Sequence, residues 1–375
     1  MTRDAADAVR RAVGAVTDPE LRRPLSELDM VREITVDGDT AHVEIALTIV
    51  GCPAADRIEA DVRAAAARVP GIAQVDLTVG VMTPAERTAL TERLRRGRAA
   101  RQMPFGPGSL TRVILVGSGK GGVGKSTLTA NLAVALAARG LAVGLIDADV
   151  HGFSIPGLLG IPPGTRPTKV GELMLPPVAH EVKTISIGMF LDDPEQAVAW
   201  RGPMLHRTVS QFLTDVFFGE LDFLLIDMPP GTGDVAISIG QLLPHAEVLV
   251  VTTPQVAASD VAIRSGKVAR QTGQKVIGVI ENMAALTLPD GTVLDMFGAG
   301  GGARVAEALS AGGEPVPLLA SIPLSTALRT GGDTGMPVVL GAQEDAAARS
   351  IRDLAAHLTA QGRGLAGRPL PVTLR

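Results

Sequence analysis

A glycine-rich segment that ends in lysine, serine and threonine contains the residues best suited to chemistry. It reads Gly119, Lys120, Gly121, Gly122, Val123, Gly124, Lys125, Ser126 and Thr127. The spacing G-x-x-x-x-G-K-[ST] is that of a phosphate-binding loop, in which glycines let successive backbone N–H groups turn toward phosphate oxygens. The sequence therefore predicts a bound nucleoside triphosphate, with Lys125 at its β- and γ-phosphates and the Ser126 hydroxyl as a ligand of Mg²⁺.

The segments on either side of this loop predict how it is positioned. An aliphatic run at 113–116 precedes it, and a helix-forming stretch follows at 128–140. Arg139 lies in the expected last turn, and Gly140 suits the position just past the helix end. A strand, a glycine loop and a helix in this order bring phosphates to the positive end of the helix.

Polar residues follow three further aliphatic runs. Asp147 and Asp149 end the run near 145, Asp227 ends the run at 224–226, and Glu281 and Asn282 follow the run at 279–280. In an open parallel sheet, ligands bind outside the carboxyl ends of the strands. We therefore expect these side chains to form one site with the glycine loop.

The needs of phosphoryl transfer suggest a role for each of these residues. Asp227 is expected to hold Mg²⁺ directly or through water, and Asp147 to support the water shell of the metal. Asp149 is the candidate for positioning the attacking water. Asn282 can offer an amide donor and acceptor to the edge of adenine. The sequence has no N/T-K-x-D motif that would indicate guanine.

From residue 111 onward, aliphatic runs alternate with helix-forming stretches. The expected strands lie at 112–116, 142–147, 182–187, 223–227, 247–252, 276–281 and 317–322. Their hydrophobic runs are nearly continuous, as in a parallel sheet that helices cover on both faces. Residues 111–361 are therefore expected to form a doubly wound, mostly parallel α/β domain. Residues 362–375 are rich in glycine and proline and are expected to form a loose tail.

Residues 1–88 predict a small α+β domain. A helix is expected at 4–15, and two alternating strands at 31–36 and 41–47 flank the hairpin turn at 37–39. A second helix should begin after Cys52 and Pro53, followed by a third strand at 75–79. Residues 89–110 are expected to be the end of a basic helix and a stiff linker to the larger domain.

Composition limits the classes of partner. The 375 residues carry a formal net charge of −4 and include one Trp, eight Phe and no Tyr. Such a chain lacks stacking platforms for single strands and a basic field for DNA, so no nucleic-acid partner is expected. No uninterrupted apolar stretch is long enough for a membrane span. The single cysteine fits a reducing compartment, and we expect a cytoplasmic protein.

The second lysine of the loop, Lys120, extends the pattern to G-K-G-G-x-G-K-[ST]. This form resembles the deviant loop of the dimeric ATPases of the MinD/ParA and nitrogenase-iron-protein class. The resemblance implies a catalytic role for Lys120, whose side chain would cross a subunit interface to the partner's nucleotide. It also implies a homodimer with two ATP molecules between its chains.

Further segments, at 147–156, 200–204, 227–234 and 280–283, together with the loop, resemble the Mrp/ApbC family of iron–sulfur cluster carrier ATPases. The segments at 18–20 and 48–53 resemble the metal–sulfur cluster assembly domain that often precedes these ATPases. The resemblance implies a cytoplasmic homodimer that binds a labile [4Fe–4S] cluster at its interface. ATP hydrolysis would be coupled to transfer of the cluster to apo iron–sulfur proteins or other assembly factors.

The sequence departs from this family at the cluster ligands. Many members carry C-x-x-C shortly after the Asn-Met pair, whereas residues 284–292 contain no cysteine. A conventional [4Fe–4S] site uses four thiolates, and a dimer of this chain has only two, both from Cys52. Cys52 is a candidate ligand or transient acceptor, with a small buried side chain as the alternative. His151 and His206 are weaker candidate ligands.

Two other functions compete with the carrier interpretation. One is a MinD/ParA-like nucleotide switch or adaptor that carries no cluster; a membrane-bound version is disfavoured because residues 362–375 contain two prolines and no amphipathic period. The other is a regulatory scaffold with negligible turnover. Hydrolysis assays on variants of Lys120 and Asp149 distinguish the scaffold from an ATPase.

Overall fold

The computed structural model describes residues 2–49, 54–95, 103–150, 152–191, 202–288, 290–311 and 313–361. The chain divides into two compact units that do not follow the sequence as two consecutive blocks. The first unit comprises Met1–Met103, Arg166–Val178 and Leu213–Gly219. The second comprises Pro104–Thr165, Ala179–Phe212 and Glu220–Arg375. The expected tail at 362–375 and residues 96–102 of the expected linker lie outside the described residues.

The first unit is the small α+β fold that the sequence predicts. Its elements are α1 (Thr2–Gly14), β1 (Val31–Asp37), β2 (Thr40–Leu47), α2 (Ala55–Ala67), β3 (Gln74–Val81) and α3 (Pro84–Arg95). The sheet has the order β1-β2-β3, with β1 antiparallel and β3 parallel to β2. Alternate residues of β2, such as Val43 and Ile45, are buried in one core with Val9 of α1 and Ile58 of α2.

Two segments from later in the sequence complete the core of the first unit. β6 (Thr168–Val170) and β7 (Leu173–Leu175) form an antiparallel hairpin, whose Val170, Leu173 and Leu175 are buried among the residues of that core. The Thr91 hydroxyl of α3 donates to the Val170 carbonyl at 3.0 Å. Residues 213–219 also belong to this unit, and an isolated β-bridge pairs their Val216 with Met174 of the hairpin. Strands of three residues carry too little pattern to be predicted from sequence, and both were missed.

The second unit is a doubly wound α/β fold, which confirms the predicted class. Its eight-stranded sheet has the order β15-β12-β11-β4-β10-β5-β9-β8. The neighbouring strands from β15 to β9 are parallel. The strand bounds are Arg112–Ser118 (β4), Val143–Asp147 (β5), Val178–Ala179 (β8), Val182–Ser186 (β9), Phe223–Asp227 (β10), Glu247–Thr252 (β11), Lys275–Ala284 (β12) and Leu318–Pro323 (β15).

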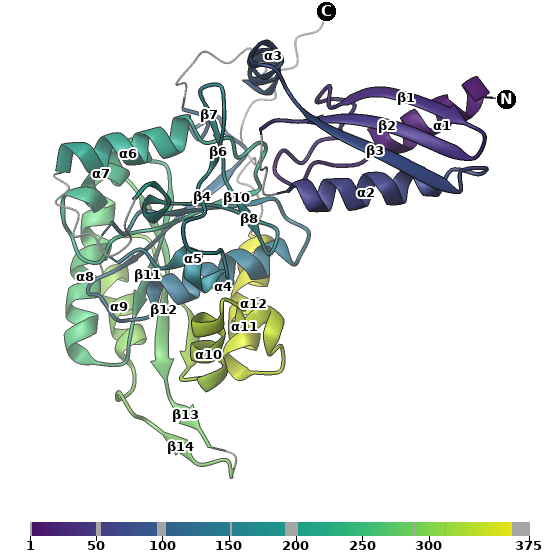
Figure 1. Ribbon diagram of the computed structural model, residues 1–375. Helices are drawn as coiled ribbons and strands as arrows, with labels where there is room; N and C mark the ends of the chain where they lie inside the picture. The colour runs from purple at the N-terminus through teal and green to yellow at the C-terminus, as the bar shows by residue number, and fades with distance from the viewer. Residues whose placement is uncertain are drawn as a thin grey trace, which may run out of the picture. The chain divides into compact units, whose positions relative to one another are not determined.

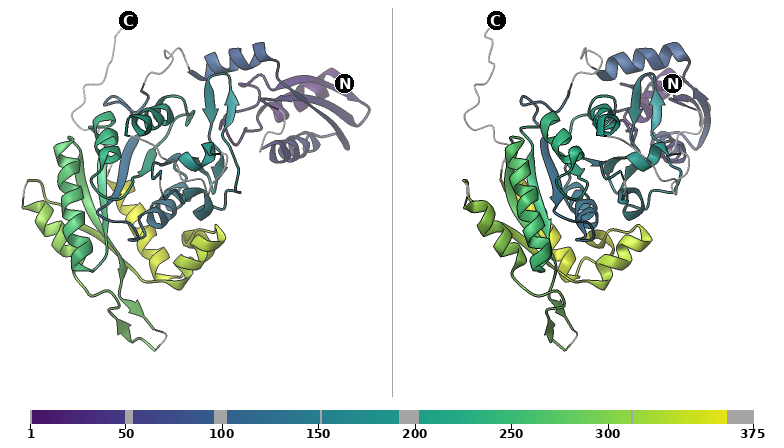
Figure 2. Two further views of the ribbon diagram at one scale, coloured as in Figure 1. Left: turned by 60° about the vertical axis from the view of Figure 1, so that its left-hand side comes forward. Right: turned by 90° about the vertical axis from the view of Figure 1, so that its left-hand side faces the viewer.

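Helices cover both faces of this sheet (Figures 1 and 2). Helices α4 (Lys125–Ala137) and α12 (Ala346–Ala360) pack together on one face, and α8 (Val256–Gln271) and α9 (Gly301–Ser310) pack together on the other. The strands are consequently apolar on both sides, and every residue of β5 and β10 is buried. The remaining helices are α5 (Ile155–Leu158), η1 (Ile187–Phe190), α6 (Gly202–Thr214), α7 (Asp234–Leu242), α10 (Thr326–Thr334) and α11 (Val338–Gly341).

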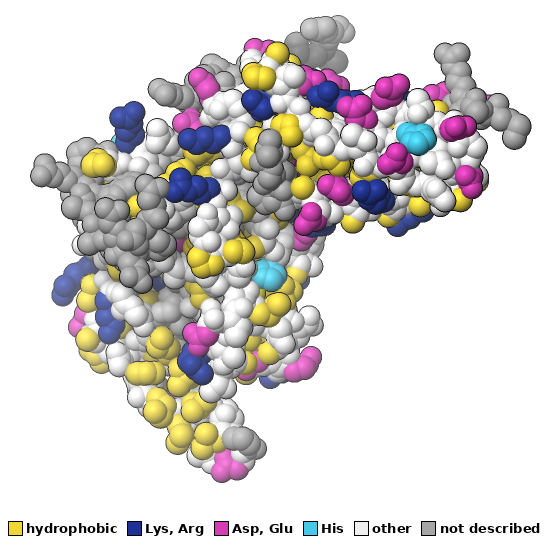
Figure 3. All heavy atoms as spheres, viewed as in Figure 1, with side chains coloured by type: hydrophobic (Ala, Val, Ile, Leu, Met, Phe, Trp, Pro, Cys, Tyr) yellow, Lys and Arg dark blue, Asp and Glu magenta, His cyan; other side chains and the backbone are white. Residues whose placement is uncertain are grey.

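A small hairpin follows β12. Its strands, β13 (Leu286–Thr287) and β14 (Val293–Leu294), are antiparallel and extend beyond the sheet of the second unit. The side chains of Val293, Leu294 and Met296 are exposed, and apolar side chains gather over this hairpin in Figure 3. Of the helices in the described ranges, none combines the length and apolar character that a bilayer crossing needs.

Candidate phosphate-binding site

The predicted glycine loop connects β4, a central strand of the sheet, to α4. Gly122 and Gly124 have φ values of +76° and +78°, a conformation that glycine takes without strain. The loop borders a cavity of about 430 Å³. The lining residues include Lys120, Gly121, Gly122, Val123, Gly124, Lys125, Ser126 and Thr127 of the loop, with Asp149, Gly152, Ser154 and Pro230 from the segments that follow β5 and β10.

Gly119 has a different position from the other loop glycines. A Cβ on Gly119 would lie 2.3 Å from backbone atoms of Val261 and Ala262 in α8. Contacts that short do not occur, so the loop can pack against α8 only if this residue is glycine. Gly119 therefore fixes the base of the loop against a helix, and its neighbours Gly121 and Gly122 line the cavity.

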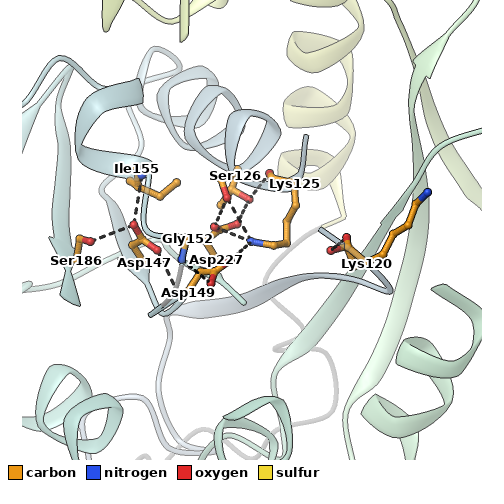
Figure 4. A network of polar contacts seen from close by, with 11 residues as sticks. Lys120, Lys125, Ser126, Asp147, Asp149, Gly152, Ile155, Ser186 and Asp227 are labelled. Atoms are coloured by element: carbon orange, nitrogen blue, oxygen red, sulfur yellow. Dashed lines mark hydrogen bonds and ion pairs between the residues drawn. The ribbon is translucent and has the colours of Figure 1, made fainter. Parts of the chain in front are cut away.

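The Lys125 ammonium lies against a buried carboxylate in this structure. Its Nζ is 2.7 Å from Oδ2 of Asp227, and the Ser126 hydroxyl donates to the same oxygen at 2.6 Å (Figure 4). The Thr129 hydroxyl, one helical turn after Lys125, donates to the other oxygen at 2.9 Å. Lys125 is only 5% exposed, so Asp227 supplies the counter-charge that its burial requires. The predicted lysine, hydroxyl and carboxylate thus meet beside the cavity.

Asp147 and Asp227 end neighbouring strands and are aligned with each other in the register of β5 and β10. Asp147 accepts hydrogen bonds from the Ser186 hydroxyl at 3.0 Å and from the Ile155 backbone N–H at 3.3 Å. Burial, and next the nearby Asp227, raise the pKa of Asp147 to about 8. Burial also raises the pKa of Asp227, although the adjacent Lys125 ammonium opposes this shift. Because Lys125 stabilises the charge on Asp227, Asp147 is the neutral acid of the pair near pH 7.

The oxygen atoms of Ser126 and Asp227 fit Mg²⁺. The hydroxyl of Ser126, a residue that lines the cavity, and the buried Asp227 carboxylate 2.6 Å from it are oxygen ligands of the kind that Mg²⁺ takes alongside phosphate oxygens. The cavity itself fits a polyphosphate, because it is bordered by glycine backbone and by the cation of Lys125.

Asp149 lies on the cavity wall, as the sequence led us to expect of a residue beyond the strand end. Its Oδ2 is 3.9 Å from the Lys125 Nζ, and its Oδ1 accepts a hydrogen bond from the Gly152 N–H at 3.2 Å. The side chain is 12% exposed, which leaves it accessible from the cavity. Gly152, Ser154 and Pro230 lie in the segments 147–156 and 227–234 that carry the family resemblance, but the sequence predicted no individual role for them.

The Lys120 side chain points away from the group formed by Lys125, Asp227 and Asp149 (Figure 4). Its Nζ donates to the side-chain oxygen of Gln255, at the start of α8, at 3.2 Å. The ammonium groups of the two loop lysines therefore lie in different places: that of Lys125 is beside Asp227, and that of Lys120 is beside the start of α8.

Asn282 lies beneath the loop. Its Nδ2 donates to the carbonyl oxygen of Val123 at 2.8 Å, and the residue is 4% exposed. The sequence suggested a contact with adenine, and Asn282 is not among the residues that line the cavity. A contact between residues 159 positions apart carries no signal in a single sequence.

Comparisons with known proteins identify the family. Residues 109–359 match the family model described as NUBPL iron-transfer P-loop NTPase, and residues 6–79 match the one described as iron-sulfur cluster assembly protein. The iron-sulfur cluster carrier protein of Mycobacterium tuberculosis (strain ATCC 25618 / H37Rv) is 54% identical over 97% of this chain and 95% of its own. The chain belongs to the Mrp/ApbC family of iron–sulfur cluster carrier P-loop NTPases.

Relatives of this family member include the carrier protein of Synechocystis, 39% identical over 94% of this chain and 96% of its own. A nucleotide-binding protein from Archaeoglobus fulgidus, solved in complex with ADP, matches with a TM-score of 0.51 and 35% identity, covering 60% of this chain and 86% of that one. The cell division ATPase MinD of Pyrococcus furiosus matches with a TM-score of 0.50 and 25% identity, over 67% of this chain and 99% of its own.

The candidate cluster ligands lie apart from the described phosphate site or outside the described residues. Cys52 and His151, both considered as ligands from the sequence, lie outside the described residues. His206 lies in α6. Within the described ranges, no three or more His, Cys, Asp or Glu side chains form a group that could hold a metal ion. The sequence has one cysteine in all, so the C-x-x-C of many family members has no counterpart in this chain.

Proposed function

We propose that this family member binds ATP with Mg²⁺ in the cavity at the glycine loop and hydrolyses it. Lys125 and Ser126, which line a cavity of about 430 Å³, both donate to the Asp227 carboxylate, at 2.7 and 2.6 Å, and this convergence carries the proposal. The solved relative from Archaeoglobus fulgidus, described in complex with ADP, supports it.

The glycine-loop backbone and Lys125 bind the phosphates, and Lys125 leaves Asp227 to do so. Ser126 and Asp227 would hold the metal, and Asp147 would support its water shell. Bound Mg²⁺ supplies positive charge that offsets the charge developing on the transferred phosphoryl group. With Lys125 at the phosphates, the buried Asp227 carboxylate would need another counter-charge, which a bound Mg²⁺ would supply.

Asp149 positions the attacking water in this mechanism. Its carboxylate lies on the cavity wall, 3.9 Å from the Lys125 Nζ, and the Gly152 N–H holds one of its oxygens. Its second oxygen is the acceptor that orients the water. Lys120 acts on the nucleotide of a second copy of this chain, as its resemblance to the dimeric ATPases implies; a side chain that points away from the Lys125 group supports this role. Hydrolysis therefore requires a homodimer.

We further propose that, in the cytoplasm, this ATPase delivers an iron–sulfur cluster to apo-proteins or other assembly factors. The name of its Mycobacterium tuberculosis relative, iron-sulfur cluster carrier protein, supports this cargo. Because the chain has one cysteine, a homodimer supplies two thiolates to the four-iron cluster. The remaining ligands then come from other side chains or from the protein that receives the cluster.

Anaerobic reconstitution with iron and sulfide tests the cargo, with the wild-type protein beside Cys52→Ser. We expect iron to bind with visible absorption of a cluster in the wild type and to be lost in the variant. A cluster that forms equally in both would remove Cys52 from the ligand set.

No cluster in either protein would favour the second candidate function, a MinD/ParA-like switch or adaptor without a cluster of its own. The single cysteine of the chain is the observation that favours this alternative. Both candidates share the same ATP site, so ATP hydrolysis does not distinguish between them.

A further inference from the structure

Two carbonyl groups of the glycine loop accept hydrogen bonds from side chains that are almost fully buried; one of these, Ser118, belongs to a residue that borders the cavity, and the other, Asn282, does not. The Ser118 hydroxyl donates to the Lys120 carbonyl at 3.0 Å, and the Asn282 amide donates to the Val123 carbonyl at 2.8 Å. Ser118 and Asn282 are 1% and 4% exposed. They come from the ends of β4 and β12, so two strands of the sheet reach the loop independently.

Holding a carbonyl fixes the direction of the next N–H group. A peptide unit is planar and trans, so its C=O and N–H point in opposite directions. The peptide that begins with the Lys120 carbonyl ends with the N–H of Gly121, and the one that begins with the Val123 carbonyl ends with the N–H of Gly124. With both carbonyls turned toward their donors, these N–H groups point away from the Ser118 and Asn282 side chains, and the glycines that carry them, Gly121 and Gly124, both line the cavity.

The Asn282 amide packs directly against Gly124 of the loop. A Cβ on Gly124 would lie 2.2 Å from the Asn282 Nδ2, so the amide occupies the space that the missing side chain leaves. The next residue, Met283, has a φ of +56°, a backbone conformation that non-glycine residues seldom adopt. Strained backbone of this kind persists where the surrounding structure constrains it.

We propose that Asn282 and Ser118 are positioning residues that aim the N–H groups of Gly124 and Gly121 at the phosphates. This inference rests on the proposed function, because it assumes a nucleotide in this cavity. The proposal also implies that the contribution of Asn282 to affinity does not depend on the base, so Asn282 should strengthen the binding of any polyphosphate. If the Asn282 amide instead bound adenine, it would contribute to the affinity for ATP and not to the affinity for a polyphosphate without a base.

Equilibrium binding of Mg²⁺-ATP and of Mg²⁺-tripolyphosphate tests the proposal. The proteins compared are the wild type, Asn282→Ala and Ser118→Ala. Each variant loses one hydrogen bond that orients a phosphate donor, so we expect affinities about tenfold weaker for both ligands, by the same factor. The matched control is Asn131→Ala, because Asn131 is also a buried asparagine but donates to the Thr127 carbonyl within α4. The control should bind both ligands as the wild type does.

Amide resonances provide a readout that general destabilisation would not reproduce. In the wild type, tripolyphosphate should shift the N–H resonances of Gly121 and Gly124, because both N–H groups donate to phosphate oxygens. Asn282→Ala should lose the shift at Gly124 and keep it at Gly121, and Ser118→Ala should do the reverse.

Weaker binding of ATP with unchanged binding of tripolyphosphate would overturn the proposal in favour of an adenine contact. Unchanged binding of both ligands by both variants would overturn it as well. A wild-type protein that binds neither ligand would instead refute the proposed ATP site, so the two failures are distinguishable.

Discussion

Asp147 and Asp227 lie opposite each other at the ends of two parallel strands, both fully buried, and only Asp227 has a cation beside it. Two carboxylates in one buried site do not both ionise readily, so the pair retains a proton on Asp147 in the protein without nucleotide. This arrangement links the metal site to the stability of the fold.

The first prediction concerns that link. Asp147 has a pKa of about 8 in the folded protein against an ordinary value of 3.8. Between these values the folded state holds a proton that the unfolded state has released, so the contribution of Asp147 to stability falls as pH rises. The slope is at most about 1.4 kcal/mol per pH unit within this window.

Asp147→Asn removes this titration. Chemical unfolding from pH 5 to pH 8, without Mg²⁺ or nucleotide, should show the wild type losing stability relative to the variant as pH rises. Parallel stability curves for the two proteins would contradict the raised pKa of Asp147.

The second prediction concerns Lys120. Lys120→Ala should bind ATP with nearly unchanged affinity, because the Lys120 side chain points away from Lys125 and Asp227 and its ammonium donates to Gln255. It should lose ATP-dependent dimerisation and turnover, measured by light scattering and phosphate release. Lys267→Ala, at an exposed position of α8, is the charge-matched control and should keep both. Full turnover by the Lys120 variant would exclude the proposed role across the interface.

The third prediction concerns Asp149. Asp149→Asn preserves the shape of the side chain but is a poor acceptor for a proton of the attacking water. We expect a turnover rate lower by about a hundredfold or more, with ATP still bound. Single-turnover hydrolysis with a separate binding assay distinguishes the two effects. If the variant hydrolyses ATP at the wild-type rate, a group other than Asp149 positions the attacking water.

The fourth prediction concerns the later segments that complete the first unit. Leu173→Ala should destabilise that unit by about 2–5 kcal/mol, because Leu173 of β7 is buried in its core. Hydrogen exchange should then accelerate in β1, β2 and β3. Lys169→Ala, at an exposed position of β6, should leave exchange in these strands unchanged. Faster exchange limited to the second unit would show that β7 does not support the first.

The sequence predicted those parts of the molecule that depend on local pattern. The spacing from Gly119 to Thr127 indicated the phosphate loop, and continuous aliphatic runs indicated the parallel strands. The meeting of Asp147 and Asp227 followed from one rule, that parallel strands end at a common edge.

Contacts between distant segments were beyond such reasoning. The hydrogen bond from Thr91 to Val170 spans 79 residues, and the one from Asn282 to Val123 spans 159. Each depends on tertiary packing, which leaves no period in the sequence. The pairing of Lys125 with Asp227 was missed for another reason: the motif indicates what the lysine binds with nucleotide present, and not what neutralises it otherwise.

The composite core of the first unit has a consequence for biosynthesis. A chain leaves the ribosome from its N-terminus, and a domain made of consecutive residues can fold as soon as its last residue emerges. Here Val170 and Phe217 are needed to cover the apolar surface formed by α1, α2 and the β1–β3 sheet. That surface stays incomplete until residues 213–219 have been made. By then β4, the phosphate loop and α4 have already emerged, so cotranslational folding of the first unit cannot finish before much of the second has been synthesised.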